Sequence, residues 1–206
     1  MLIDQLQNEI RIFCEQNADQ ALVKKYQRYF TEGYDAFGVD GKLMEQQRAA
    51  WLAQYRAQLG LEGFLELGDR LVATGKYEEA SFALGFARAF EKEFTPRTLE
   101  RLGNWLERGI GNWAHTDSFS LDLLALFITR RIISLGAISA WRQSSSRWKR
   151  RSVPVSLIKT LKMDLDIQEV LHFLAPMMND PEKVVQQGLG WFLREAWKLY
   201  PAGVEA

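Results

Sequence analysis

The chain has 206 residues, of which 47% are hydrophobic and 25% charged, and its net charge is zero; these proportions are typical of soluble globular proteins. A single cysteine, Cys14, excludes an intrachain disulfide, and the two histidines, His115 and His172, match no zinc-binding spacing. No apolar run is long enough to span a membrane, and the start MLIDQLQNEIRIF carries acids where a signal peptide carries bases, so we expect a cytoplasmic protein.

The N-terminal half predicts a series of helices. Ile3–Cys14 has apolar residues three or four positions apart, which is the spacing of one helical face. The same spacing predicts helices over Lys42–Leu59, Leu61–Ala73 and Tyr77–Phe90, with short glycine-bearing connections. Between the first two helices, Tyr26–Gly41 is rich in aromatic residues and glycines and predicts a loop.

Two proline-containing pairs predict helix starts in the rest of the chain. Thr95 is a good N-cap for a helix over Arg97–Leu106, with Pro96 as its first residue. Asp180-Pro181 has the same pattern before a helix that ends near Leu199. We expect the core stripe of that last helix to be Val185, Leu189, Phe192, Ala196 and Leu199.

The sequence therefore predicts an all-α protein. No segment alternates apolar and polar residues for long enough to be a strand. Helices of about 10 to 18 residues with short connections pack as antiparallel hairpins. We expect a HEAT-like helical-repeat solenoid (an α-α superhelix) with a period of roughly 40 residues. An irregular helix bundle is the competing architecture.

The stretch GNWAHTDSFS, residues 111–120, has two interpretations. Thr116 or Asp117 could be a plain N-cap of the apolar segment that follows. If the helix instead begins near Asn112, then Trp113 and Asp117 lie one turn apart on the same face. An aromatic side chain and a carboxylate would then be presented together. His115, between them, is interpreted as structural.

The middle third of the chain is basic. From Arg97 to Lys162 there are twelve Lys and Arg residues but four Asp and Glu residues, a local charge of +8. Arg147, Lys149, Arg150 and Arg151 fall at a predicted helix start after a serine-rich turn. Bases in a first turn oppose the helix dipole, which favours an anionic partner over a simple solvated surface.

The seven tryptophans divide into two groups. Helix phase predicts that Trp51, Trp105 and Trp197 lie in the core or at its rim. Trp113, Trp148 and Trp191 are candidate site residues, and Trp191 lies off the core stripe between Gly188 and Gly190. Trp113 precedes Arg151 by 38 residues, and Arg151 precedes Trp191 by 40. In a 40-residue solenoid these three positions would be equivalent and would line one concave face.

At these residues the chain resembles the AlkD-like DNA alkylation-repair glycosylases, a family built from HEAT-like repeats. The similarity is carried by KYEEASFALGFARAF, NWAHTD, WKRRSVPVSL and VVQQGLGWFLREAWKLYP, and the last of these is the most specific. The resemblance implies one HEAT-like domain over residues 1–206. It also implies that the C-terminal helix pair of typical members, which follows KLYP, is missing here.

The resemblance also implies roles for individual residues. Asp117 matches the catalytic carboxylate, Trp113 and Trp191 match aromatics that contact the lesion nucleotide, and Arg151, or Arg150 by one register, matches a phosphate-binding arginine. Tyr26 resembles an aromatic near the lesion. The remaining candidates for DNA contact are Arg147, Trp148, Lys149 and Arg194.

The implied activity is hydrolysis of the N-glycosidic bond of N3- or N7-alkylated purines in duplex DNA. Because alkylation leaves the base positively charged, the reaction needs mainly a carboxylate to stabilise the oxocarbenium-like sugar and to position water. The resemblance implies no cofactor, no metal, no membrane partner, no deep lesion pocket, and a monomer. Two other hypotheses remain: a non-catalytic HEAT-like module that binds DNA or another polyanion, and a protein-binding scaffold.

Overall fold

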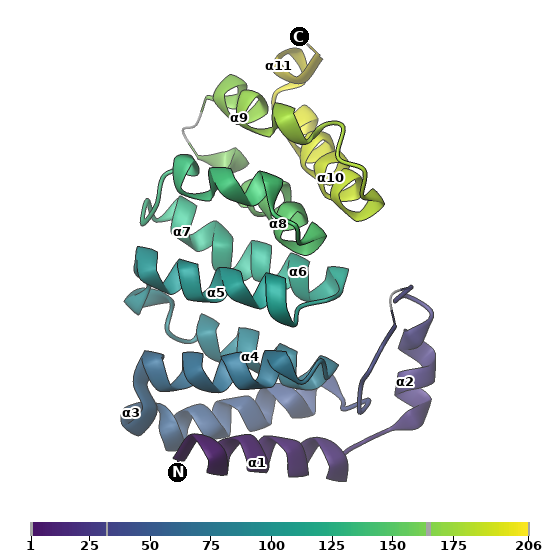
Figure 1. Cartoon of the computed structure of the whole chain (residues 1–206), viewed down its shortest axis with the longest axis vertical. Coiled ribbons are helices and arrows are strands. Elements are labelled where there is room, and N and C mark those ends of the chain that lie inside the picture. Colours follow the sequence, from purple (N-terminus) through teal and green to yellow (C-terminus); the bar gives the residue numbers. More distant parts are fainter. Residues whose placement is uncertain (1, 32, 164–165, 206) are drawn as a thin grey trace. The chain divides into compact units, whose positions relative to one another are not determined.

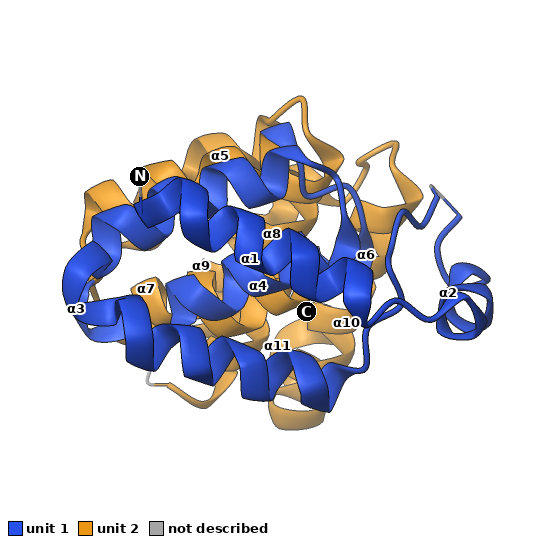
Figure 2. Ribbon diagram, turned by 90° about the horizontal axis from the view of Figure 1, so that it is seen from below, with its two compact units in different colours: residues 1–93, 108–115 blue, residues 94–107, 116–206 orange. Residues whose placement is uncertain are grey.

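The computed structural model describes residues 2–31, 33–163 and 166–205, and these residues form helices, turns and loops without any strand. The predicted all-α class is therefore confirmed. The chain divides into two compact units (Figure 2): unit 1 comprises residues 1–93 and 108–115, and unit 2 comprises residues 94–107 and 116–206. None of the helices within the described ranges is long and apolar enough to cross a membrane.

Unit 1 is built mainly from three helices that lie side by side (Figure 1): α1 (Leu2–Gln16), α3 (Gly41–Ala73) and α4 (Tyr77–Arg88). A fourth helix, α2 (Gln20–Gln27), precedes the loop that leads into α3. The sequence analysis missed α2, which begins where the Asp19 carboxylate accepts a hydrogen bond from the Ala21 N–H at 2.7 Å. Tyr26 accordingly lies in a helix rather than in the predicted loop.

Gly60 divides α3 into the two helices that the sequence predicts. Its φ of 56° and ψ of −172° interrupt the helical backbone between residues 41 and 73. Positive φ values are readily adopted only by glycine, so this position requires one. The predicted boundary between Leu59 and Leu61 is thus confirmed by the backbone itself.

The core of unit 1 is rich in aromatic side chains. Leu6, Ile10 and Cys14 form the fully buried face of α1. Trp51 is 3% exposed, as predicted, and its ring packs edge-on against Phe82 with centroids 5.3 Å apart. These contacts fix α1 and α4 on α3.

Unit 2 contains the remaining helices, most of them short. Helix α5 (Pro96–Arg108) starts as predicted, with Thr95 as its cap. Helix α6 (Trp113–Phe119), whose first three residues belong to unit 1, a π-helical turn (Ser120–Leu124) and α7 (Ala125–Thr129) follow one another without a break. Next come a 3₁₀ segment (Leu135–Gln143) and the helices α8 (Arg147–Leu157), α9 (Ile167–Leu174), α10 (Lys183–Leu199) and α11 (Pro201–Glu205).

Helices α8 and α10 pack closely against each other. Gly188 permits this approach, because a Cβ at that position would lie 3.2 Å from Cγ of Arg151 and 3.3 Å from a methyl carbon of Val155. The predicted core stripe of α10 is confirmed at Val185, Leu189, Phe192 and Ala196.

Three predictions about packing in unit 2 have different outcomes. Leu199 was predicted to be buried but is 48% exposed, because it is the last residue of α10. Trp105 is 2% exposed and belongs to the core, whereas Trp197 is 49% exposed and lies at the rim. Asp180 does not cap α10, because the helix starts at Lys183 and the Asp180 carboxylate instead accepts from the Glu182 N–H at 2.9 Å.

Candidate functional site

Helix α6 begins at Trp113, which decides between the two interpretations of GNWAHTDSFS. The side-chain oxygen of Asn112 accepts a hydrogen bond from the backbone N–H of His115 at 2.9 Å. Asn112 is therefore the N-cap, and neither Thr116 nor Asp117 has that role. Trp113 and Asp117 lie four residues apart on one helix, as the second interpretation predicts.

His115 is a structural residue, as expected from the sequence. Its side chain is 4% exposed and stacks on Tyr77 with ring centroids 4.3 Å apart. The Asn112 amide donates to Nδ1 at 2.9 Å, which leaves the proton of the neutral ring on Nε2, where it is donated to Ser81 Oγ at 2.9 Å. Burial lowers the pKa of His115 to about 4, so the ring is neutral at physiological pH.

Trp113 presents its indole to solvent. The side chain is 40% exposed, and its Nε1–H donates to the backbone carbonyl of Tyr29 at 3.0 Å. One face of the indole stacks on Phe30, with centroids 5.7 Å apart and an interplanar angle of 15°. The ring is therefore held in one orientation while part of it stays accessible.

In unit 2, Asp117 and Arg151 form a bidentate ion pair. Nε of Arg151 donates to Oδ1 of Asp117 at 2.8 Å, and Nη2 donates to Oδ2 at 2.9 Å. The two side chains are 14% and 7% exposed, respectively. Nη1 of Arg151 also donates to the carbonyl of Val184 at 2.6 Å, which ties the guanidinium to the start of α10. The carboxylate is thus held in a fixed position.

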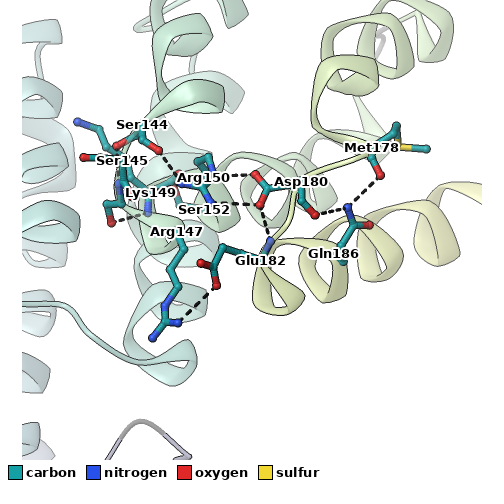
Figure 3. A network of polar contacts seen from close by, with 11 residues as sticks. Ser144, Ser145, Arg147, Lys149, Arg150, Ser152, Met178, Asp180, Glu182 and Gln186 are labelled. Atoms are coloured by element: carbon teal, nitrogen blue, oxygen red, sulfur yellow. Dashed lines mark hydrogen bonds and ion pairs between the residues drawn. The ribbon is translucent and has the colours of Figure 1, made fainter.

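The other bases of the 147–151 cluster also have acidic partners in unit 2. Arg150 makes a bidentate pair with Asp180, at 2.6 and 3.1 Å (Figure 3). Lys149 Nζ lies 2.8 Å from a carboxylate oxygen of Glu107, and Arg147 lies 3.4 Å from one of Glu182. Carboxylates of the same unit thus account for part of this basic cluster, beside the anionic partner that the sequence suggests. Acids 30 to 42 positions away in the sequence pair with these bases within the unit.

The remaining candidates occupy different environments. Trp148 is 6% exposed and packs in the core of unit 2. Cζ of Arg147 lies 5.1 Å from the centroid of the Trp148 ring. Trp191 is partly exposed on α10. Arg194 is exposed and pairs with the adjacent Glu195 at 3.3 Å. Tyr26 is 41% exposed on α2 in unit 1, with Lys25 Nζ 5.2 Å from its ring.

Most residues that support these side chains were not predicted from the sequence. Asn112 offered a local signal, because asparagine is a favoured N-cap. That preference favours a helix start at Asn112 over one at Thr116 or Asp117. The carbonyls of Tyr29 and Val184, and the acidic partners Asp180 and Glu182, are distant in the sequence and gave no such signal.

Comparisons with known proteins bear on the fold and the family of this chain. A family model described as "DNA alkylation repair enzyme" matches residues 14–206. The crystal structure of AlkD2 from Streptococcus mutans is 20% identical, over 90% of this chain and 86% of that one, with a TM-score of 0.61. This likeness confirms the HEAT-like fold class. No curated protein matches the chain. Because the family model covers nearly the whole sequence, the chain belongs to the DNA alkylation repair enzyme family.

Proposed function

We propose that the protein is a DNA glycosylase that releases N3- or N7-alkylated purines from duplex DNA. The observation that carries the proposal is the Asp117 carboxylate, held by both arms of the Arg151 guanidinium and 14% exposed. A fixed carboxylate is what the reaction requires, because charge that develops in the transition state is best stabilised by a group that need not reorganise.

The chemistry follows from the charge of the substrate. An alkylated purine carries a positive charge, so the C1′–N bond breaks with its electron pair passing to the ring nitrogen, and the base leaves as a neutral molecule. The sugar becomes oxocarbenium-like, water adds to C1′, and that water loses a proton to Asp117 or to solvent. Each carboxylate oxygen of Asp117 has a second lone pair for this purpose.

Arg151 has two proposed roles. It positions Asp117 through the bidentate contact, because that contact fixes both oxygens of the carboxylate. In addition to the bonds to Asp117 and Val184, Nη1 and Nη2 each have one further N–H. We propose that these groups hold a DNA phosphate. Arg150 is excluded from that role because Asp180 takes its Nε and Nη2, and the carbonyls of Ser144 and Ser145 take both N–H groups of Nη1.

The aromatic and exposed basic side chains supply the remaining DNA contacts. The accessible face of Trp113 and the partly exposed Trp191 suit contact with the sugar and the cationic nucleotide. Tyr26 is exposed and suits the same kind of contact. The more exposed cations, Arg147 and Arg194, suit the phosphate backbone. The buried Trp148 is left out of this set.

A base-release assay tests the proposal. Duplex DNA carrying N7-methylguanine or N3-methyladenine should yield free base and abasic sites faster than the spontaneous reaction. Release at the spontaneous rate, with the duplex demonstrably bound, would reject the glycosylase.

One observation favours a non-catalytic DNA-binding module instead. Both carboxylate oxygens of Asp117 are engaged by Arg151, as in a purely structural ion pair. This alternative predicts DNA binding that weakens as salt rises and that Asp117→Asn leaves unchanged, with no base release by either protein.

A further inference from the structure

Unit 1 contains a cavity of about 760 Å³, whose lining includes two of the predicted site residues, Tyr26 and Trp113. It is bounded by α2, by the loop before α3, by α3 and α4, and by the first residues of α6. Its volume lies within the range of small-molecule sites. The resemblance to AlkD-like glycosylases implies no deep lesion pocket, so the cavity needs an explanation from its own chemistry.

The walls of the cavity are largely aromatic. They include Tyr26, Phe30, Tyr77, Phe82 and Trp113. Phe30 is stacked between Trp113 and Tyr34, so it supports the indole, and the surfaces left for a ligand are those of the more exposed Trp113 and Tyr26. Flat π surfaces of this kind favour a flat ring as ligand, and their affinity is tolerant of which nucleobase they meet.

Arg48, on α3, is the cationic group of the cavity wall. Its side chain is 34% exposed, and among the described residues its single ion-pair partner is the exposed Glu45, at 3.8 Å, which is too far for a hydrogen bond. The guanidinium thus has N–H donors that remain available to a ligand. Arginine donates well to purine acceptors, of which 7-methylguanine keeps O6 and 3-methyladenine keeps N7.

Gly85, on α4, makes room for this arginine. A Cβ at residue 85 would lie 2.5 Å from Nη1 and 2.6 Å from Cδ of Arg48. The backbone of Gly85 has no unusual conformation that would itself require glycine, since its φ is in the ordinary range. The glycine is therefore explained by the course of the Arg48 side chain, which it allows to lie along α4 at the cavity wall.

The geometry points to a binding site for a neutral purine base in this cavity. The aromatic walls match the ring, and Arg48 matches its acceptor edge. A cationic alkylpurine nucleoside would be repelled by the guanidinium, whereas the same base becomes neutral once the glycosidic bond has broken and its electron pair has returned to the ring. Arg48 thereby favours the released base over the intact nucleotide.

The source of that base rests on the proposed function, but its binding can be measured without DNA. Free 3-methyladenine and 7-methylguanine are titrated into the full chain by isothermal calorimetry, with tryptophan fluorescence as a second readout. We expect saturable binding of both purines and weaker binding of cytosine, because its single ring covers less of the aromatic walls.

Two variants and a matched control locate the site. Arg48→Gln and Gly85→Ala should each raise the Kd for the purines by about fivefold or more, the lower end for an arginine–base contact. Arg56→Gln is the control, because Arg56 is also on α3 and also lies 3.8 Å from a carboxylate, that of Glu93, but does not line the cavity. Circular dichroism checks that each variant folds. If Gly85→Ala fails to fold, the binding data for Arg48→Gln, which adds no volume, decide the test.

Each outcome bears on one proposal alone. The absence of saturable purine binding, or a Kd that Arg48→Gln leaves unchanged, would overturn the cavity assignment. Free-base binding without any base release from alkylated DNA would remove the glycosylase proposal and leave the cavity assignment standing. Base release without free-base binding would overturn the cavity assignment and leave the glycosylase proposal standing.

Discussion

Replacing Asp117 with asparagine tests the catalytic carboxylate, but the change also breaks a largely buried ion pair. Asp117 and Arg151 are 14% and 7% exposed and are joined by two hydrogen bonds. Loss of activity in Asp117→Asn could therefore reflect either missing charge at the reaction centre or an unstable protein. The two effects have different magnitudes and can be separated.

The stability effect comes from the uncompensated guanidinium. Removing one partner of a buried ion pair typically costs about 3–5 kcal/mol. Arg151 keeps its bond to the Val184 carbonyl, so we expect the lower end, about 3 kcal/mol. For a chain of this size that corresponds to a fall in Tm of roughly 6–12 °C.

The catalytic effect is a loss of transition-state stabilisation. Removing one preorganised electrostatic group typically costs about 2.7–4 kcal/mol, or roughly 10²–10³ in rate. Asp117→Asn should therefore slow base release by roughly that factor in single-turnover assays, run well below its lowered Tm.

Asp180→Asn is the matched control. Asp180 forms the same kind of bidentate pair with Arg150, and those side chains are 6% and 12% exposed. We expect a similar fall in Tm, measured by differential scanning calorimetry, with base release close to that of the wild type. If Asp117→Asn retains release, or if both variants lose it equally, the carboxylate is structural and the catalytic argument is wrong.

Three further predictions concern stability. Burial lowers the folded-state pKa of His115 to about 4, so between pH 6.5 and 4 the unfolded chain binds one proton more than the folded chain. Urea denaturation should therefore show the free energy of unfolding falling by about 3 kcal/mol as the pH is lowered through this window. His115→Gln should lack this pH-dependent loss. Gly60→Ala should lower the free energy of unfolding in urea by about 1–3 kcal/mol, because a φ of 56° with a ψ of −172° is a conformation that essentially only glycine adopts. Gly190→Ala, in open space on α10, should raise it by about 0.5–1 kcal/mol, and equal effects of the two variants would contradict this reasoning. Glu78 is 2% exposed, and its carboxylate accepts hydrogen bonds from the backbone N–H groups of residues 37–39, in the loop before α3. Glu78→Gln should therefore speed proteolysis of that loop. Glu45→Gln, at an exposed site, should not.

The features that sequence analysis predicted correctly are local. The apolar spacing identified α1, both parts of α3, and α4, because one helical face is defined by residues three and four positions apart. Thr95 and Pro96 predicted the start of α5, because capping involves only the next few backbone N–H groups. Gly60 predicted the break in α3 for a comparable reason.

The predictions that were wrong or missing depend on residues far apart in the chain. Nothing in the sequence indicated that Asp180, Glu182 and Glu107, from other segments, pair with the basic 147–151 cluster. The cavity in unit 1 combines four helices and a loop, and its arginine depends on a glycine 37 positions away. No periodicity reports such a combination.

Asp117 and Arg151 show where the division falls. Their residue types and the surrounding motifs marked both as site candidates from the sequence alone, and the helix start at Asn112 was one of two local alternatives. That the arginine holds the carboxylate, 34 positions away, was decided by the packing of α6, α8 and α10 in unit 2. Hydrogen bonds and ion pairs act over a few ångströms, so which side chains meet depends on how the helices pack, whereas helix formation itself depends mainly on near neighbours in the chain.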